Sequence, residues 1–199
     1  THTHTHTERR SQMATGINTA ACVAGGVYIA IVAGTFAALH GIEGTWAGWQ
    51  QATCLPDDCF CEAPRAGLLR QPSNTFSNLA FAVTGTYVLA VLPRTHAPAS
   101  VAPLYTVFAL CFAAACLLTG ATSGFYHASL TFLGQWMDNM GMFLMLSAPF
   151  LYSLCRQLHA TAPALLASYA VLNMGVGWAE VRFAAIRREM FGVLVVALL

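Results

Sequence analysis

A histidine and an aspartate flank a short turn between two long apolar segments. His127 lies near the end of the first segment, and Asp138 lies within the second. Asp138 is the only acidic residue between Glu62 and Glu180. Two helices joined by such a short turn run antiparallel, so we expect His127 and Asp138 at one end of a helix pair and at similar depth. Ionisable side chains within apolar segments are costly in a bilayer and usually serve a function.

Two further polar residues share the helix faces of this pair. Ser123 precedes His127 by four positions, and Gln135 precedes Asp138 by three, spacings that place each pair on one helix face. A cluster of this kind suits a metal ion or a proton relay, and zinc is the ion that imidazole favours. The alternatives are a histidine–aspartate contact that only joins two helices and a Ser–His–Asp triad, for which no nucleophile-elbow motif is present.

A second polar cluster precedes the apolar segment that begins near Phe76. Ser73 or Asn74 is predicted to cap a helix that starts near Pro72. Acidic and amide oxygens are also the ligands that calcium prefers. Asp58, Glu62 and Asn74 are therefore candidate calcium ligands. The alternative is a capped helix start beside a solvated acidic loop.

The composition limits the class of protein. Of the 199 residues, 57% are hydrophobic and 9% are charged, whereas soluble domains carry about 25% charged residues. The chain therefore resembles neither a soluble globule nor a disordered protein. A net charge of +1 leaves no basic surface for nucleic acid. We predict an all-α, polytopic transmembrane helix bundle, an integral multi-pass membrane protein.

Apolar runs define the expected spans, since a bilayer needs about 20 apolar residues per helix. The five full spans are Ile17–Leu39, Phe76–Leu92, Ala102–Tyr126, Phe132–Leu154 and Ala162–Trp178, and a truncated sixth begins near Met190. Residues 1–12 are tag-like or read-through sequence, and residues 13–40 form an extra span or signal anchor. Because the sixth run is too short to cross a bilayer, we expect residues 74–199 to be incomplete at the C-terminus.

Residues 41–73 form the one long polar stretch and are expected outside the membrane. They contain Cys54, Cys59 and Cys61. One disulfide can form among these three if the loop faces an oxidising compartment, and its pairing cannot be read from the sequence. Three free thiols are the alternative.

The motifs in their order and spacing resemble the alkaline ceramidase family, part of a superfamily of seven-helix membrane hydrolases with the adiponectin-receptor-like and Per1-like proteins. The resemblance covers about Cys61–Phe150. Its blocks are Cys61-Glu62, Asn74-Thr75-Phe76-Ser77-Asn78-Leu79, Ser123-Gly124-Phe125-Tyr126-His127-Ala128-Ser129-Leu130 and Gln135-Trp136-Met137-Asp138.

This resemblance implies a zinc-dependent intramembrane amidase that cleaves the N-acyl bond of ceramide to sphingosine and a fatty acid. His127 matches the first of the family's three zinc-binding histidines. Asp138 matches the proton acceptor and donor, and Ser123 matches the residue that binds the oxyanion or orients water. Gln135 lies beside them as a supporting residue. The family's two C-terminal histidines are absent, so we expect the 199-residue chain to be inactive by itself.

The family also binds calcium, and Glu62 matches one of its carboxylates. Gln71 and Pro64 stand where other family ligands are expected, which weakens the match. Two other functions stay open: a related lipid hydrolase or receptor-like protein, and a non-catalytic membrane protein. The acyl-chain preference and the oligomeric state cannot be read from the sequence.

Overall fold

The computed structural model describes residues 19, 22–35, 38, 46–55, 61–92, 98–183, 191–193 and 195–196. Within these residues the chain is helical and forms no strand, although Gln51 and Thr131 form a single bridge. The helices are Cys22–Thr35, α2 (Pro72–Ser77), α3 (Leu79–Val91), α4 (Ala102–Ser129), α5 (Phe132–Gln157) and α6 (Ala162–Arg182). The prediction of an all-α fold is confirmed.

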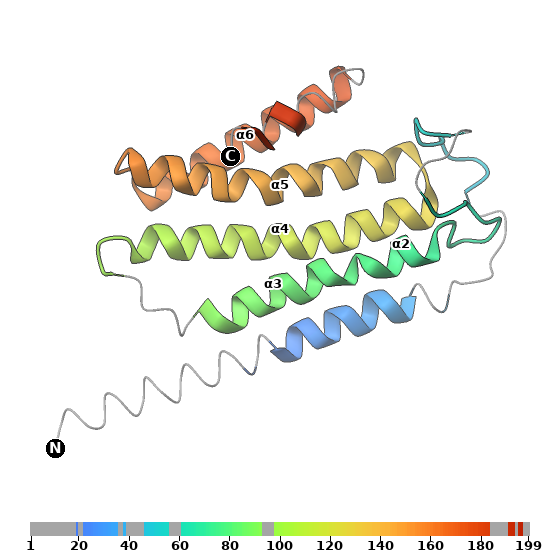
Figure 1. Ribbon diagram of the computed structural model, residues 1–199, viewed down its shortest axis with the longest axis horizontal. Coiled ribbons are helices and arrows are strands. Elements are labelled where there is room, and N and C mark those ends of the chain that lie inside the picture. The colour runs from blue at the N-terminus through green and yellow to red at the C-terminus, as the bar shows by residue number, and fades with distance from the viewer. Residues whose placement is uncertain are drawn as a thin grey trace.

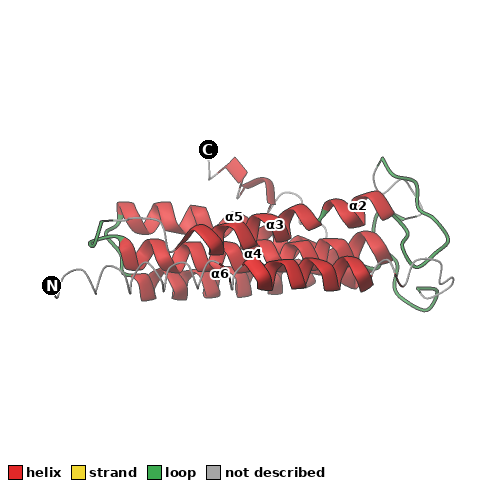
Figure 2. Cartoon of the chain, turned by 90° about the horizontal axis from the view of Figure 1, so that it is seen from below, coloured by secondary structure: helices red, strands yellow, loops and turns green. Residues whose placement is uncertain are grey.

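The helices form an elongated bundle with α4 at its centre. Helix α4 packs against α3, α5 and α6, and α5 also packs against α6 (Figure 1). Figure 2 shows that the loops gather at the two ends of the bundle. The α4–α5 turn lies at the same end as residues 46–55 and 61–71 (Figure 1). This end of the bundle carries the polar residues that the sequence singled out.

The helices only partly match the predicted membrane spans. Within the described residues, α4 and α6 are long and apolar enough to cross a membrane. Helices α2 and α3 follow each other directly through Asn78, whose backbone is also helical, and α3 alone has 13 residues, fewer than the length of a span. Helix α5 is less apolar because it carries polar side chains such as Gln135 and Asp138. Five full spans are therefore not confirmed. Residues 1–12 and half of the expected sixth span, namely 190, 194 and 197–199, lie outside the described residues.

A two-residue turn makes α4 and α5 antiparallel. Leu130 ends α4 in the left-handed region, with φ of 47°. Thr131 then caps α5, and its hydroxyl accepts a hydrogen bond from the Gly134 N–H over 3.1 Å. A side chain at Gly134 would collide with Ser129 and Tyr126, each about 2.9 Å from an added Cβ. The short turn thus fixes the register of the two helices that carry His127 and Asp138.

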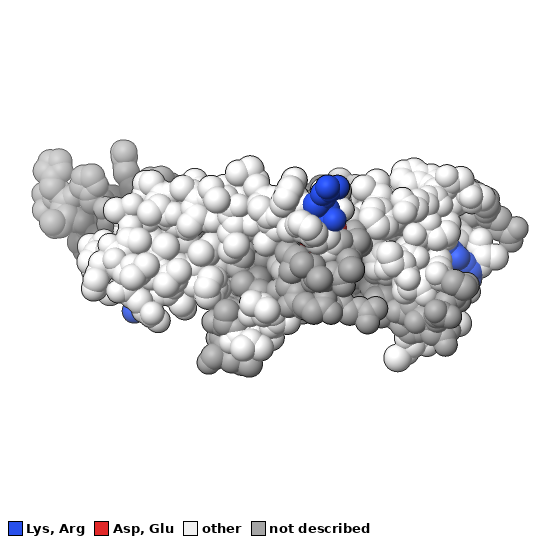
Figure 3. Space-filling model, turned by 90° about the horizontal axis from the view of Figure 1, so that it is seen from above, with Lys and Arg blue, Asp and Glu red and all other residues white. Residues whose placement is uncertain are grey.

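The outer surface of the bundle is mostly apolar. Val171, Met174 and Trp178 on α6 are 66%, 67% and 65% exposed. The face shown in Figure 3 is almost free of charge apart from a few arginines. Exposed apolar side chains along a helix of membrane-spanning length are typical of a lipid-facing surface. This surface favours membrane association.

Candidate active site

A polar cavity of about 350 Å³ lies near the α4–α5 turn. Its walls come from the start of α3 and from the facing surfaces of α4 and α5. The lining residues are Asn78, Phe81, Thr119, Ser123, Tyr126, His127, Gln135, Asp138, Asn139 and Met142. The structure therefore brings Ser123, His127, Gln135 and Asp138 around one cavity.

Ser123, His127 and Asp138 are all largely withdrawn from solvent. Their exposed fractions are 6%, 9% and 7%. The Ser123 hydroxyl on α4 faces the Asp138 carboxylate on α5 across the cavity. The Asp138 carboxylate therefore shares the cavity with the imidazole of His127. A buried carboxylate and imidazole can exchange protons with a ligand there.

The tautomer of His127 is set by Gln71, which is fully buried. The Gln71 Nε2 donates a hydrogen bond to the backbone oxygen of Glu62 over 2.7 Å. This contact turns the Gln71 Oε1 toward His127, 2.8 Å from its Nδ1. Because a carbonyl oxygen only accepts, Nδ1 must carry the proton, and the lone pair of the neutral ring is on Nε2.

This arrangement fits a metal-binding imidazole. Metal-binding histidines usually donate their second ring N–H to a carbonyl or carboxylate, which fixes the ring and its tautomer. His127 has that partner in Gln71. Across the described parts of the chain, however, no three His, Cys, Asp or Glu side chains gather as a metal site. His127 thus fits one ligand position, and the described residues do not complete a zinc site.

A loop formed by residues 46–55 crosses the α4–α5 turn beside the cavity. The Ala52 N–H donates to the Leu130 oxygen over 2.9 Å, and the Phe132 N–H donates to the Gln50 oxygen over 2.8 Å. Gln135, predicted as a supporting residue, exchanges hydrogen bonds of 2.9–3.0 Å with Thr53. The 46–55 loop is therefore fixed to a residue that lines the cavity.

Cys54 in this loop forms a disulfide, which confirms that a disulfide is present in the 41–73 stretch. Cys61 is a free thiol, and Cys59 lies outside the described residues. The Cys54 sulfur lies 3.4 Å from the Tyr126 hydroxyl. Since a disulfide sulfur has no proton to give, Tyr126 is the donor. The disulfide thus also contacts a side chain that lines the cavity.

Glu62 caps α2 from outside the helix. Its carboxylate accepts hydrogen bonds from the N–H groups of Ser73 and Asn74 over 3.0 and 2.8 Å. Burial raises the pKa of Glu62, but these backbone donors and the charge of Arg65 outweigh it, so the pKa lies below its usual value. The prediction that Ser73 or Asn74 caps the helix is wrong, because Gln71 is the N-cap and Glu62 satisfies the free N–H groups.

The same contact bears on the candidate calcium ligands. Glu62 and Asn74 lie together, but through the carboxylate and the backbone N–H rather than through two side-chain oxygens. Asp58 lies outside the described residues. A calcium site at these residues stays a prediction.

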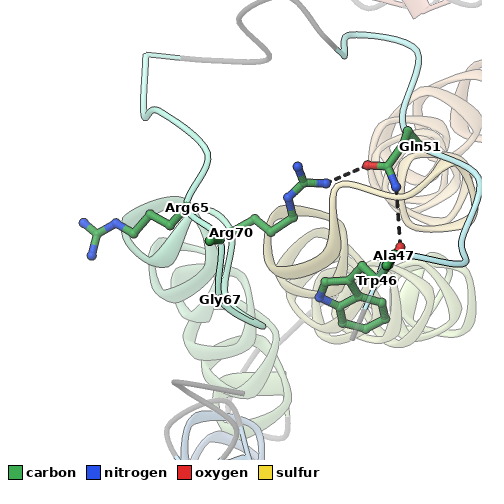
Figure 4. A pocket seen from close by; sticks show the side chains of 7 residues that line it. Trp46, Ala47, Gln51, Arg65, Gly67 and Arg70 are labelled. Atoms are coloured by element: carbon green, nitrogen blue, oxygen red, sulfur yellow. Dashed lines mark hydrogen bonds between the residues drawn. The ribbon is translucent and has the colours of Figure 1, made fainter. Parts of the chain in front are cut away.

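A smaller pocket of about 220 Å³ lies between the 46–55 loop and residues 65–70 (Figure 4). Arg70 reaches across it and donates to the Gln51 Oε1 over 2.7 Å, whereas Arg65 points away. This pocket includes none of the residues that line the His127 cavity. Its contact joins the 46–55 loop to the segment that precedes α2.

The Ceramidase family model matches residues 71–199, more than half of the chain. The chain belongs to the ceramidase family. The match includes every residue that lines the His127 cavity, and it confirms the family resemblance seen in the motifs. Membership implies a hydrolase of lipid metabolism whose substrate is ceramide or a lipid like it. No curated protein and no solved structure was found to match.

The sequence interpretation missed several residues at this end of the bundle. The role of Gln71 beside His127 carries no local signal, because 56 positions separate the two. Asn139 lines the cavity and donates to the Glu180 Oε2 over 3.2 Å. Glu180 did carry a signal, since it is the next acidic residue after Asp138 and ends an apolar run.

Proposed function

We propose that this protein is a zinc-dependent amide hydrolase that cleaves the N-acyl bond of ceramide within a membrane and releases sphingosine and a fatty acid. The observation that carries the proposal is the hydrogen bond from the His127 Nδ1 to Gln71. It leaves Nε2 as the ligand atom at a cavity that Ser123 and Asp138 also line. Membership of the ceramidase family supports the substrate class.

Each residue has a role that its position supports. His127 would hold zinc through Nε2, and zinc bound there would supply a Lewis acid that polarises a carbonyl and lowers the pKa of water to about 7. Asp138 accepts the proton of the attacking water and returns it to the leaving amine. Ser123 lies beside Asp138 in the cavity lining and donates to the oxyanion or orients the water. Further zinc ligands must come from outside the described residues.

The proposal places the protein in the membrane as a multi-pass protein. Helices α4 and α6 have the length and apolarity of spans. The face of Figure 3, which carries few charged side chains among the described residues, and the exposed apolar side chains of α6 suit contact with lipid. Because α4 carries Ser123 and His127 near one of its ends, the cavity is expected near one membrane surface.

A non-catalytic role, in which a histidine–aspartate contact only joins two helices, is less well supported. The hydrogen-bond partner of the His127 Nδ1 is Gln71 rather than Asp138. A helix-joining contact has no need of this fixed tautomer, whereas a metal ligand does.

Metal binding tests the proposal. The protein is expressed from its complete reading frame, purified in detergent and dialysed against buffered zinc. We expect the parent protein to retain stoichiometric zinc and His127→Ala to lose it. His159→Ala is the matched control, because His159 is exposed beyond the end of α5 and its loss leaves zinc unchanged. Equal zinc content in the parent and in His127→Ala contradicts the proposal.

A further inference from the structure

A second carboxylate is buried beside the cavity. Glu180 on α6 has an exposed fraction of 0%. Its Oε2 accepts a hydrogen bond from the Asn139 Nδ2 on α5 over 3.2 Å. A carboxylate within an apolar bundle is costly unless polar partners stabilise it, and such residues are rarely kept without a function. Asn139 is one such polar partner of Glu180, and its own position indicates what this contact does.

Asn139 connects Glu180 to the cavity. It lines that cavity together with Ser123, His127 and Asp138. A side-chain amide has a donor end and an acceptor end, and an ionised carboxylate only accepts. Glu180 therefore fixes the Nδ2 end of Asn139 toward α6. The Oδ1 end is left as a hydrogen-bond acceptor for the cavity.

We propose that Asn139 is a specificity residue whose Oδ1 accepts a hydrogen bond from a hydroxyl or amide N–H of the lipid in the cavity. Glu180 is the positioning residue that holds the Asn139 amide in this orientation. The inference rests on the proposed function only in that the ligand is the same lipid. Ceramide carries an amide N–H and two hydroxyl groups, whereas a glycerol triester has no such donor.

The physical basis of this selectivity is an unsatisfied acceptor. A site built to bind an O–H or N–H group rejects an analogue that lacks it, because the polar group of the site then stays buried without a partner. The apolar chains of the two lipids contribute similarly to binding. The ratio of the dissociation constants of the two lipids therefore reports the hydrogen bond to Asn139 rather than the overall affinity for lipid.

Binding of the two lipids tests the proposal. The purified protein in detergent micelles is titrated with ceramide or with a glycerol triester of similar size, and the ratio of the two dissociation constants is measured. We expect the parent to prefer ceramide. Asn139→Leu should lower this preference about tenfold, the effect of one lost hydrogen bond. Glu180→Gln should lower it by about threefold, since a glutamine can pair with either end of the Asn139 amide.

Asn173→Leu is the matched control. Asn173 is a buried amide on α6 with an exposed fraction of 6%, and its Nδ2 donates to the Ser147 hydroxyl over 2.8 Å. It is not among the residues that line the His127 cavity. Its loss should lower thermal stability and leave the preference for ceramide unchanged.

An unchanged preference in folded Asn139→Leu overturns the inference. If that variant does not fold, Glu180→Gln decides, because it conserves volume, and an unchanged preference there overturns the inference as well. The binding measurement can fail or succeed independently of the hydrolase test, since binding needs no turnover. A protein that shows the Asn139-dependent preference but releases no fatty acid refutes the hydrolase and leaves this inference standing.

Discussion

The His127 Nδ1 lies 2.8 Å from the Gln71 Oε1, although 56 positions separate the two residues in the chain. Gln71 is itself oriented by the backbone oxygen of Glu62. The segment before α2 therefore determines which ring nitrogen of His127 is available to a metal. This relationship links the loop segment that precedes the bundle to the chemistry proposed within it.

Gln71→Leu should weaken zinc binding by about 10- to 100-fold, the usual effect of removing a supporting partner of a metal-binding histidine. Leucine cannot accept the Nδ1 proton, so both tautomers of His127 become accessible. Zinc competition with a chelator measures the change. Gln157→Leu, at the exposed end of α5, is the control and should keep the parent affinity. Equal affinities for the parent and Gln71→Leu would refute the tautomer argument.

Gly85→Ala should destabilise the bundle by about 1–3 kcal/mol through overpacking. An added Cβ would lie 2.7 Å from the backbone oxygen of Ala113, so α3 and α4 must move apart. Thermal unfolding in detergent measures the effect. Gly175→Ala on α6 is the control, because no atom lies within 4 Å of its added Cβ. That variant should gain up to about 1 kcal/mol from helix propensity, and a loss as large as that of Gly85→Ala would refute the packing argument.

Acid should release the cap of α2. Glu62 has a pKa below its usual value of 4.5, so the folded state favours its charged form. The resulting stability is present above pH 4.5 and is lost as the pH falls through the lower pKa of the folded state. Hydrogen exchange at the Ser73 and Asn74 amides, followed from neutral to acid pH, should report this loss. Glu62→Gln should show raised exchange already at neutral pH, and slow exchange in that variant counts against the cap.

Cys54→Ser should loosen the 46–55 loop, because the disulfide helps to hold it against Tyr126. The Ala52 N–H donates to the Leu130 oxygen and the Phe132 N–H donates to the Gln50 oxygen, and amide exchange at Ala52 and Phe132 should become faster. A reductant should produce the same change in the parent and none in Cys54→Ser. Cys61→Ser is the control, since Cys61 is a free, exposed thiol. Parent-like exchange in Cys54→Ser would show that the hydrogen bonds alone hold the loop.

The sequence predicted the local parts of the site because local spacing determines them. The four-residue step from Ser123 to His127 and the short turn before Asp138 were enough to place these residues around one cavity. Helices α5 and α6 run past their predicted ends to Gln157 and Arg182, because those ends were placed where the apolar run stops, whereas a helix can continue through polar residues such as Arg156.

The contacts that the sequence did not predict join distant segments. The pairing of Gln71 with His127 and of Thr53 with Gln135 depends on how the loops fold over the bundle, and no periodic pattern encodes it. The cap of α2 was assigned to the wrong residue for the same reason, since Glu62 lies outside the helix. Glu180 is different, because a single acidic residue at the end of an apolar run was itself a signal.

Release of fatty acid from ceramide by the protein and by Asp138→Asn tests the central claim most directly. Both proteins are expressed from the complete reading frame and reconstituted in lipid vesicles with zinc. We predict that the parent releases fatty acid and that Asp138→Asn keeps its zinc but loses at least about 100-fold in rate, the typical contribution of a general base. Equal rates for the two proteins, or no release by a zinc-loaded parent, would contradict the account.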